Sequence, residues 1–274
     1  MVHKVLLPLT ALIALLALAR LPVVADEADP LGSVMWNDMR ARFFAGARIE
    51  FDEQVKIAVP RIVENQAQVP VTADARALGR VVSLMVFADL NPIQHVLTLS
   101  PVQADPYIAF RMKVEQATPV RAAALTPDGV WHVGSAYVDA AGGGCSAPAM
   151  ARKDADWSET VGQAQGRLWR EAGGATRVKL RIRHPMDTGL TKDNIPAFYI
   201  ERLEMKRASG EPLAELEMFE PVSEDPTVTM LVKLPLADTA VAVEGRDNNG
   251  GVYRSVIPAR WKQSSADAPF GLPR

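Results

Sequence analysis

The sequence holds a single cysteine, Cys145, inside a run of small residues that extends from Gly142 to Pro148. Three consecutive glycines, Gly142, Gly143 and Gly144, precede it, and such a run loses much conformational entropy when it is ordered. We therefore expect this arm to be mobile and the thiol to be reachable by solvent, clear of any packed core. A thiol reacts as its thiolate, yet no Lys, Arg or His lies within six residues of Cys145 on either side.

A mobile thiol of this kind suits a covalent carrier better than a catalyst. A cysteine hydrolase needs a base and an oxyanion site held rigidly around its nucleophile, and a flexible arm cannot hold that geometry. Cys145 is thus interpreted as a substrate thiol that is activated inside a partner enzyme, and no enzymatic activity is predicted for the chain itself. The alternative is a buried, inert cysteine, which the absence of large apolar neighbours disfavours.

Other candidate residues give weaker signals. His95, His132 and His184 lie on separate segments without the spacing of a metal site, which favours structural or surface roles. Ser146 is not part of a G-x-S-x-G nucleophile elbow. Residues 247–250 lack the alternating acidic residues and closing Glu of a calcium loop, so a hairpin turn is predicted there. We expect neither a metal site nor a cofactor.

The composition and the first residues indicate an exported globular protein. Of the 274 residues 48% are hydrophobic and 23% charged, and a net charge of −2 offers no basic excess for nucleic acid. Lys4, the apolar run from Val5 to Ala19 and small residues up to Ala25 have the layout of a signal peptide over residues 1–25. The alternative is an uncleaved membrane anchor, but the apolar run is shorter than the roughly 20 residues that a spanning helix needs, which favours cleavage. No later stretch is long and apolar enough to span a membrane, so no span is expected after cleavage. A lone cysteine in an oxidising compartment suggests a working thiol or an intermolecular bond.

Short strands on both sides of the arm must position the cysteine. Residues 33–46 predict one helix, capped by Ser33 and ended by Gly46, with an apolar face for docking. From Phe51 onward, apolar residues alternate with polar ones in short runs separated by turns, which is typical of antiparallel sandwiches. In one such run, after the arm, Val178, Leu180 and Ile182 alternate with the basic residues Arg177, Lys179, Arg181 and Arg183.

These patterns predict an all-β chain of two antiparallel β-sandwich domains joined by a glycine-rich arm and linker. The predicted parts are a signal peptide (1–25), a first sandwich with its N-terminal helix (26–139), the arm and linker (140–174), a second sandwich (175–262) and a flexible tail (263–274).

Two sets of motifs resemble those of a known family, one in the first predicted sandwich and the start of the arm, and the other in the second sandwich. The first set is Glu64-Asn65, Val69-Pro70-Val71, the Asn91-Pro92 turn, a strand with Arg111, and Gly143-Gly144-Cys145. The second set is His184-Pro185-Met186-Asp187-Thr188-Gly189, Ile195-Pro196-Ala197, Pro221-Val222-Ser223, Asp247-Asn248 and Gly250-Gly251-Val252-Tyr253. The first sandwich resembles the SoxY subunit, and the second the SoxZ subunit, of the SoxYZ sulfur-carrier proteins of bacterial thiosulfate oxidation.

The resemblance implies immunoglobulin-like sandwiches and a periplasmic carrier, with both subunits fused into one chain. It implies that a sulfur-containing intermediate rides on Cys145, and that the partners are periplasmic redox enzymes of sulfur oxidation or a quinoprotein dehydrogenase system. The family's arm is a free C-terminal tail ending Gly-Gly-Cys-Gly-Gly, whereas here Ser146-Ala147-Pro148 follows the cysteine and the chain continues. An alternative function is a non-covalent binding or assembly factor for a periplasmic quinoprotein dehydrogenase.

Overall fold

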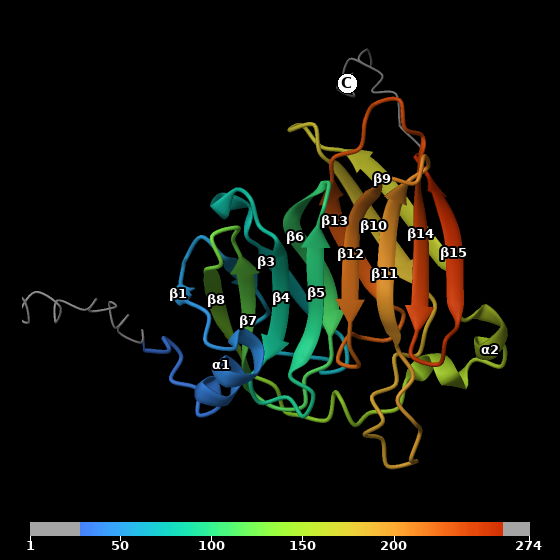
Figure 1. Cartoon of the computed structure of the whole chain (residues 1–274). Coiled ribbons are helices and arrows are strands. Elements are labelled where there is room, and N and C mark those ends of the chain that lie inside the picture. Colours follow the sequence, from blue (N-terminus) through green and yellow to red (C-terminus); the bar gives the residue numbers. More distant parts are fainter. Residues whose placement is uncertain (1–27, 260–274) are drawn as a thin grey trace, which may run out of the picture.

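The computed structural model describes residues 28–259, which form two packed β-sheets with short helices at their margins (Figure 1). The strands before the arm are β1 (Ile49–Phe51), β2 (Lys56–Ala58), β3 (Val69–Asp74), β4 (Ser83–Ala88), β5 (His95–Pro101), β6 (Ala104–Met112), β7 (Thr118–Leu125) and β8 (Trp131–Val138). Those after it are β9 (Ala164–Arg170), β10 (Thr176–Ile182), β11 (Ile200–Arg207), β12 (Pro212–Met218), β13 (Thr227–Val232), β14 (Ala240–Asp247) and β15 (Val252–Pro258). The helices are α1 (Trp36–Phe44), α2 (Trp157–Thr160) and two 3₁₀ turns (Arg76–Leu78 and Met150–Lys153).

Both sheets run without a break through the two halves of the chain, which we define as residues 28–139 and 164–259, and residues 140–150 are called the arm. One sheet has the order β1-β8-β7-β4-β5-β12-β11-β14-β15 and the other β2-β3-β6-β13-β10-β9. The halves join where β5 pairs with β12, with Leu99 opposite Leu216, and where β6 pairs with β13, with Ile108 opposite Met230. Figure 1 shows the nine-stranded sheet in front of the six-stranded one.

The core between the sheets follows from the period-two alternation of the strands. In β10, Val178, Leu180 and Ile182 are buried while the basic residues between them face outward. Buried apolar residues from both halves form one continuous cluster. Burying a side chain of this size contributes roughly 1.5–3 kcal/mol, so the two halves stabilise each other through a shared core.

Helix α1 packs on the outer face of the nine-stranded sheet. Trp36, Met39 and Phe44 are buried there, and Phe43, predicted on the docking face, is half-buried with its ring 4.9 Å from that of Phe87. The helix ends where Ala45 adopts a left-handed conformation, one residue before Gly46.

The all-β prediction with a short N-terminal helix is confirmed, and so are the turn at Thr126–Gly129 and the turn at residues 247–251. The segment 140–174, predicted as arm and linker, also contains the strand β9, which pairs with β10 at the edge of its sheet. The sequence does not predict this strand, because Leu168 is its one buried residue and the strand lacks the apolar–polar alternation of the others. The predicted signal peptide (1–25) and the predicted tail (263–274) both lie outside the described residues. Within residues 28–259, no helix has the length and apolarity that crossing a membrane requires.

Candidate functional site

The cysteine of the arm is fully buried between the two halves of the chain. Cys145 has 0% relative exposure, and Gly144 beside it is buried as well. The expectation of a mobile thiol in contact with solvent is therefore wrong for this structure, in which the arm is docked. That Cys145 carries a covalent cargo stays a prediction.

The glycines are held by the first half of the chain. The main-chain N–H groups of Gly143 and Gly144 donate to the oxygens of Glu115 and Val114, at 3.2 and 3.1 Å. A Cβ at Gly144 would lie 2.2 Å from the main-chain oxygen of Gln66, so no other residue fits there without a backbone shift. The sequence predicts that these glycines make the arm flexible. In the structure, Gly144 also lets the backbone of the arm lie directly against the backbone of Gln66 and Val114.

Two side chains grip the peptide around the cysteine from opposite sides. The Glu115 carboxylate accepts hydrogen bonds from the N–H groups of Cys145 and Ser146, at 2.9 and 3.1 Å, and from the Ser146 hydroxyl at 3.0 Å. From the second half of the chain, the Thr188 hydroxyl donates to the Cys145 oxygen at 2.6 Å. Charge-assisted bonds such as those to Glu115 are among the stronger hydrogen bonds of proteins. Glu115 and Thr188 therefore hold the arm in a defined position, which we call the seat of Cys145.

A buried lysine joins the halves beside this seat. The Lys113 ammonium donates to the main-chain oxygens of Met186, Glu220 and Val222, at 2.6, 2.9 and 2.7 Å. Its three N–H groups are thereby used. Burial lowers the pKa of Lys113 to about 8, against an opposing effect of Cys145 and nearby carboxylates. The sequence offered no cation near Cys145, and the fold supplies one from 32 positions earlier.

The docked thiol is held in its unreactive, protonated form. Burial raises the pKa of Cys145 to about 12, with the Lys113 charge opposing the shift and the Glu115 charge adding to it. Because the thiolate is the nucleophile, the buried position of Cys145 disfavours covalent chemistry at neutral pH.

The loop from His184 to Gly189 forms the wall of the seat in the second half. Met186 lies in the left-handed region with φ 51°, and its N–H donates to Nδ1 of His184 at 3.0 Å. Burial lowers the pKa of His184 to about 4, so its ring is neutral at physiological pH. Asp187 binds the Arg152 guanidinium at 2.5 Å, which ties the chain beyond the arm to this loop.

The structure does not bring the other candidate residues together. His95 stacks on Phe219, with ring centroids 4.0 Å apart, and His132 binds Asp52 at 2.9 Å, so each histidine has its own structural partners. Within the described part of the chain, no three His, Cys, Asp or Glu side chains are grouped so that they could hold a metal ion.

Ser146 and the turn after β14 have structural roles as well. Ser146 donates to Glu115 and has no histidine among the partners of its hydroxyl. Asp247 accepts the N–H groups of Asn249 and Gly251, at 2.9 and 2.8 Å, as a carboxylate does in a tight turn. These contacts agree with the predicted turn rather than with an ion loop.

The comparisons with known proteins match the first half of the chain to SoxY and the second half to SoxZ, in the order that the sequence motifs predict. The family model of "Sulfur oxidation protein SoxY" matches residues 40–145, and that of "Sulphur oxidation protein SoxZ" matches residues 167–258. The SoxY match thus ends at the cysteine. A comparison with curated proteins gave no match.

One solved structure that is similar to this chain is the sulfur carrier protein SoxY from Chlorobium limicola f thiosulfatophilum. It shares 21% sequence identity over 39% of this chain and 96% of its own length, with a TM-score of 0.35. The two family matches, in this order along one polypeptide, show that the chain belongs to the SoxYZ-like proteins, with SoxY and SoxZ regions fused.

Proposed function

We propose that this protein is a periplasmic carrier that holds a sulfur-containing intermediate covalently on Cys145 and presents it to partner enzymes. The observation that carries the proposal is the seat of the arm. A SoxY region that ends at the only cysteine of the chain is closed over by a loop of the SoxZ region, through the bond from Thr188 to Cys145. The signal-like segment at residues 1–25 supports a periplasmic location.

The carrier works between a docked and an undocked arm. Docked, Cys145 is a buried thiol with a raised pKa, sheltered from oxidants and stray electrophiles. Undocking breaks the hydrogen bonds that Glu115 accepts and the one that Thr188 donates, at a net cost of about 1 kcal/mol for each neutral bond and more for each charged one. A free-energy difference of a few kcal/mol between the docked and undocked states leaves a minor population with an exposed thiol. A partner enzyme binds this undocked form and activates the thiol in its own active site.

The partners under this proposal are periplasmic redox enzymes of sulfur oxidation or a quinoprotein dehydrogenase system. The chain itself acts as their substrate, since the docked thiol has no base within hydrogen-bonding reach among the described residues and the Lys113 donors are already used.

Mass spectrometry of the protein purified from its native host tests this function. We expect sulfur adducts on the tryptic peptide that contains Cys145, and loss of host function in the Cys145→Ser variant. A fully functional Cys145→Ser variant would exclude the carrier role. It would favour a non-covalent assembly factor for a quinoprotein dehydrogenase, which predicts that a partner is captured regardless of Cys145.

A further inference from the structure

A row of basic side chains on the outer face of the six-stranded sheet has no part in the carrier site. The alternation in β10 turns Lys179 and Arg181 outward, and the strand register sets Arg167 of β9 directly opposite Lys179. Arg111 projects from β6 on the other side of β13. Like charges directly opposite each other destabilise a sheet, so the pair of Arg167 and Lys179 needs a separate reason.

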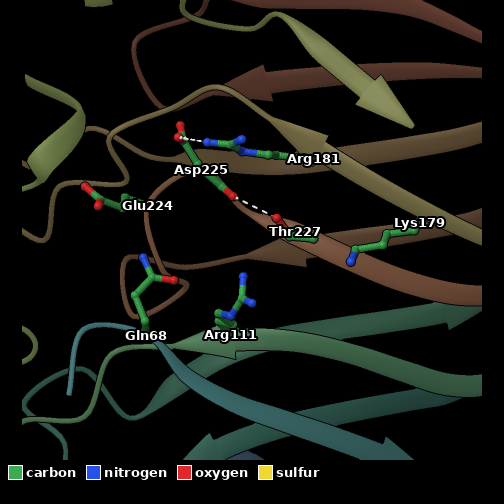
Figure 2. Close-up of a pocket in the computed structure, with 7 residues that line it drawn as sticks. All are labelled: Gln68, Arg111, Lys179, Arg181, Glu224, Asp225 and Thr227. Carbon is green, nitrogen blue, oxygen red and sulfur yellow. Dashed lines mark hydrogen bonds and ion pairs between the residues drawn. The ribbon is translucent and has the colours of Figure 1, made fainter. Parts of the chain in front are cut away.

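Three of these side chains, Arg111, Lys179 and Arg181, line a cleft that spans the junction of the two halves. The cleft has a volume of about 310 Å³ and is called the seam groove; it is lined by Gln68, Arg111, Lys179, Arg181, Glu224, Asp225 and Thr227. Figure 2 shows Arg111 and Gln68 on one side and Lys179 and Arg181 on the other, with Thr227 between them. The short threonine on the central strand leaves the hollow, because longer side chains rise from the strands that flank it.

The seam groove has more positive charge than its own carboxylates neutralise. Asp225 is occupied by Arg181 at 2.6 Å and Arg183 at 3.3 Å. The carboxylate of Glu224 accepts the N–H of Ala151 at 3.1 Å. By contrast, the side chains of Arg111, Lys179 and Arg167 form no hydrogen bond or ion pair within residues 28–259.

The groove also lies beside two segments that contact the arm or the residue after it. The turn that contains Glu224 holds Ala151, which follows the arm. The loop that ends at Gln68 includes Gln66, whose oxygen accepts the N–H of Val114 at 2.8 Å and faces Gly144. A ligand in the groove therefore lies beside Gln68 and Glu224, whose segments contact Gly144 and Ala151.

We propose that the seam groove binds an extended, carboxylate-rich segment of the partner protein that exchanges cargo with Cys145. Neighbouring strands lie about 4.8 Å apart, so Arg111 on β6 and Lys179 on β10 are roughly 10 Å apart across the sheet, and Arg167 on β9 continues the row of unpaired cations beyond the groove. One small oxyanion cannot reach all of them, whereas alternate residues of an extended chain lie about 7 Å apart and can. This inference rests on the proposed carrier function for the identity of the partner, but not for the binding itself.

Fluorescence anisotropy with labelled hexaglutamate tests the groove on the whole chain. We expect salt-sensitive binding that weakens about fivefold to tenfold in the Arg111→Ala/Lys179→Ala double variant. The matched control is Arg80→Ala/Lys192→Ala, which removes two exposed basic residues elsewhere and should leave the affinity unchanged. Circular dichroism of each variant verifies the fold, and amide shifts in the wild type should move at Gln68 and Thr227.

The outcomes separate this proposal from its rivals. Equal losses in both double variants, or no loss in either, would overturn it. Displacement of the peptide by sulfate at constant ionic strength, at concentrations as low as those of the peptide, would assign the groove to small oxyanions instead. The Cys145→Ser variant should bind hexaglutamate as the wild type does, so a failed search for adducts on Cys145 would not by itself count against the groove.

Discussion

The Lys113 ammonium of the SoxY region lies 2.6 Å from the main-chain oxygen of Met186 in the SoxZ region. This contact crosses the junction at the wall of the cysteine seat, and two further carbonyl groups complete the lysine's environment. A buried ammonium group of the SoxY region that donates to three main-chain oxygens of the SoxZ region fixes the relative position of the two regions. Lys113 is thus the central element of the junction, and several consequences of the seat can be measured.

The Lys113→Met variant should be strongly destabilised. Methionine has a similar length but leaves the carbonyls of Met186, Glu220 and Val222 without that donor, and an unsatisfied buried polar group costs about 1–3 kcal/mol. We expect the free energy of unfolding to fall by about 3 kcal/mol, measured by urea denaturation. Lys179→Met, at an exposed position, serves as the control and should change it by less than about 0.5 kcal/mol. Equal effects in the two variants would contradict the structural role of Lys113.

Removing the grip of Glu115 should expose the thiol. In Glu115→Ala the N–H groups of Cys145 and Ser146 lose their acceptor, so the undocked population rises. We expect the thiol to react with a disulfide reagent at pH 8 about tenfold faster than in the wild type. Glu53→Ala removes an exposed carboxylate far from the arm in sequence and should react at the wild-type rate. If Glu115→Ala is as slow as the wild type, the carboxylate does not hold the arm.

Gly144→Ala should release the arm although it adds only one methyl group. Its Cβ would lie 2.2 Å from the oxygen of Gln66 and 2.5 Å from that of Val114, and the neighbouring backbone would have to move. Fast labelling of Cys145 in a protein with unchanged circular dichroism is the expected result. Gly173→Ala is the matched control, because a Cβ there meets nothing within 4 Å. Were the glycines needed for mobility alone, Gly144→Ala would slow the labelling instead.

Alkaline pH should weaken the docked state through Cys145. Burial raises the pKa of this thiol from 9.0 to about 12, so the folded protein keeps a proton that the unfolded chain loses above about pH 9. The stability that the neutral thiol contributes is therefore fully present below pH 9 and is lost as the pH rises toward 12. We expect undocking to limit the loss, because the arm can leave its seat while the sheets stay paired.

The comparison of the wild type with Cys145→Ser isolates this effect from all other titrating groups. We expect the melting temperature of the wild type to fall more than that of the variant between pH 9 and pH 11, as measured by calorimetry. Parallel curves for the two proteins would show that the thiol does not titrate in its seat.

Local patterns in the sequence predicted the elements of the fold but not how distant elements meet. The alternation in β10 and the turn before β8 are local signals, and both strands form where expected. The pairing of β5 with β12 depends on contacts more than a hundred residues apart, for which no local signal exists. For that reason the sequence predicted two separate sandwiches, whereas their sheets are shared.

The candidate site shows the same division between residue identity and environment. Cys145 was found from its residue type and its small neighbours. Its seat depends on Lys113, Glu115 and Thr188, which come from 32 positions before the cysteine to 43 after it. Lys113 follows an alternating strand and would be expected to face solvent, so only the tertiary structure reveals that the second half buries it.

The 3₁₀ turn Met150–Lys153 holds the chain directly after the arm, because Ala151 donates a hydrogen bond to Glu224. This attachment limits the depth of any active site that Cys145 can enter. Met150 lies five positions after Cys145, and a fully extended chain covers about 3.4 Å per residue. The Cα atom of Cys145 can thus move no more than about 17 Å from that of Met150. An enzyme that serves this protein must offer its reactive centre close to its surface, or in a trough open at both ends through which a loop can pass.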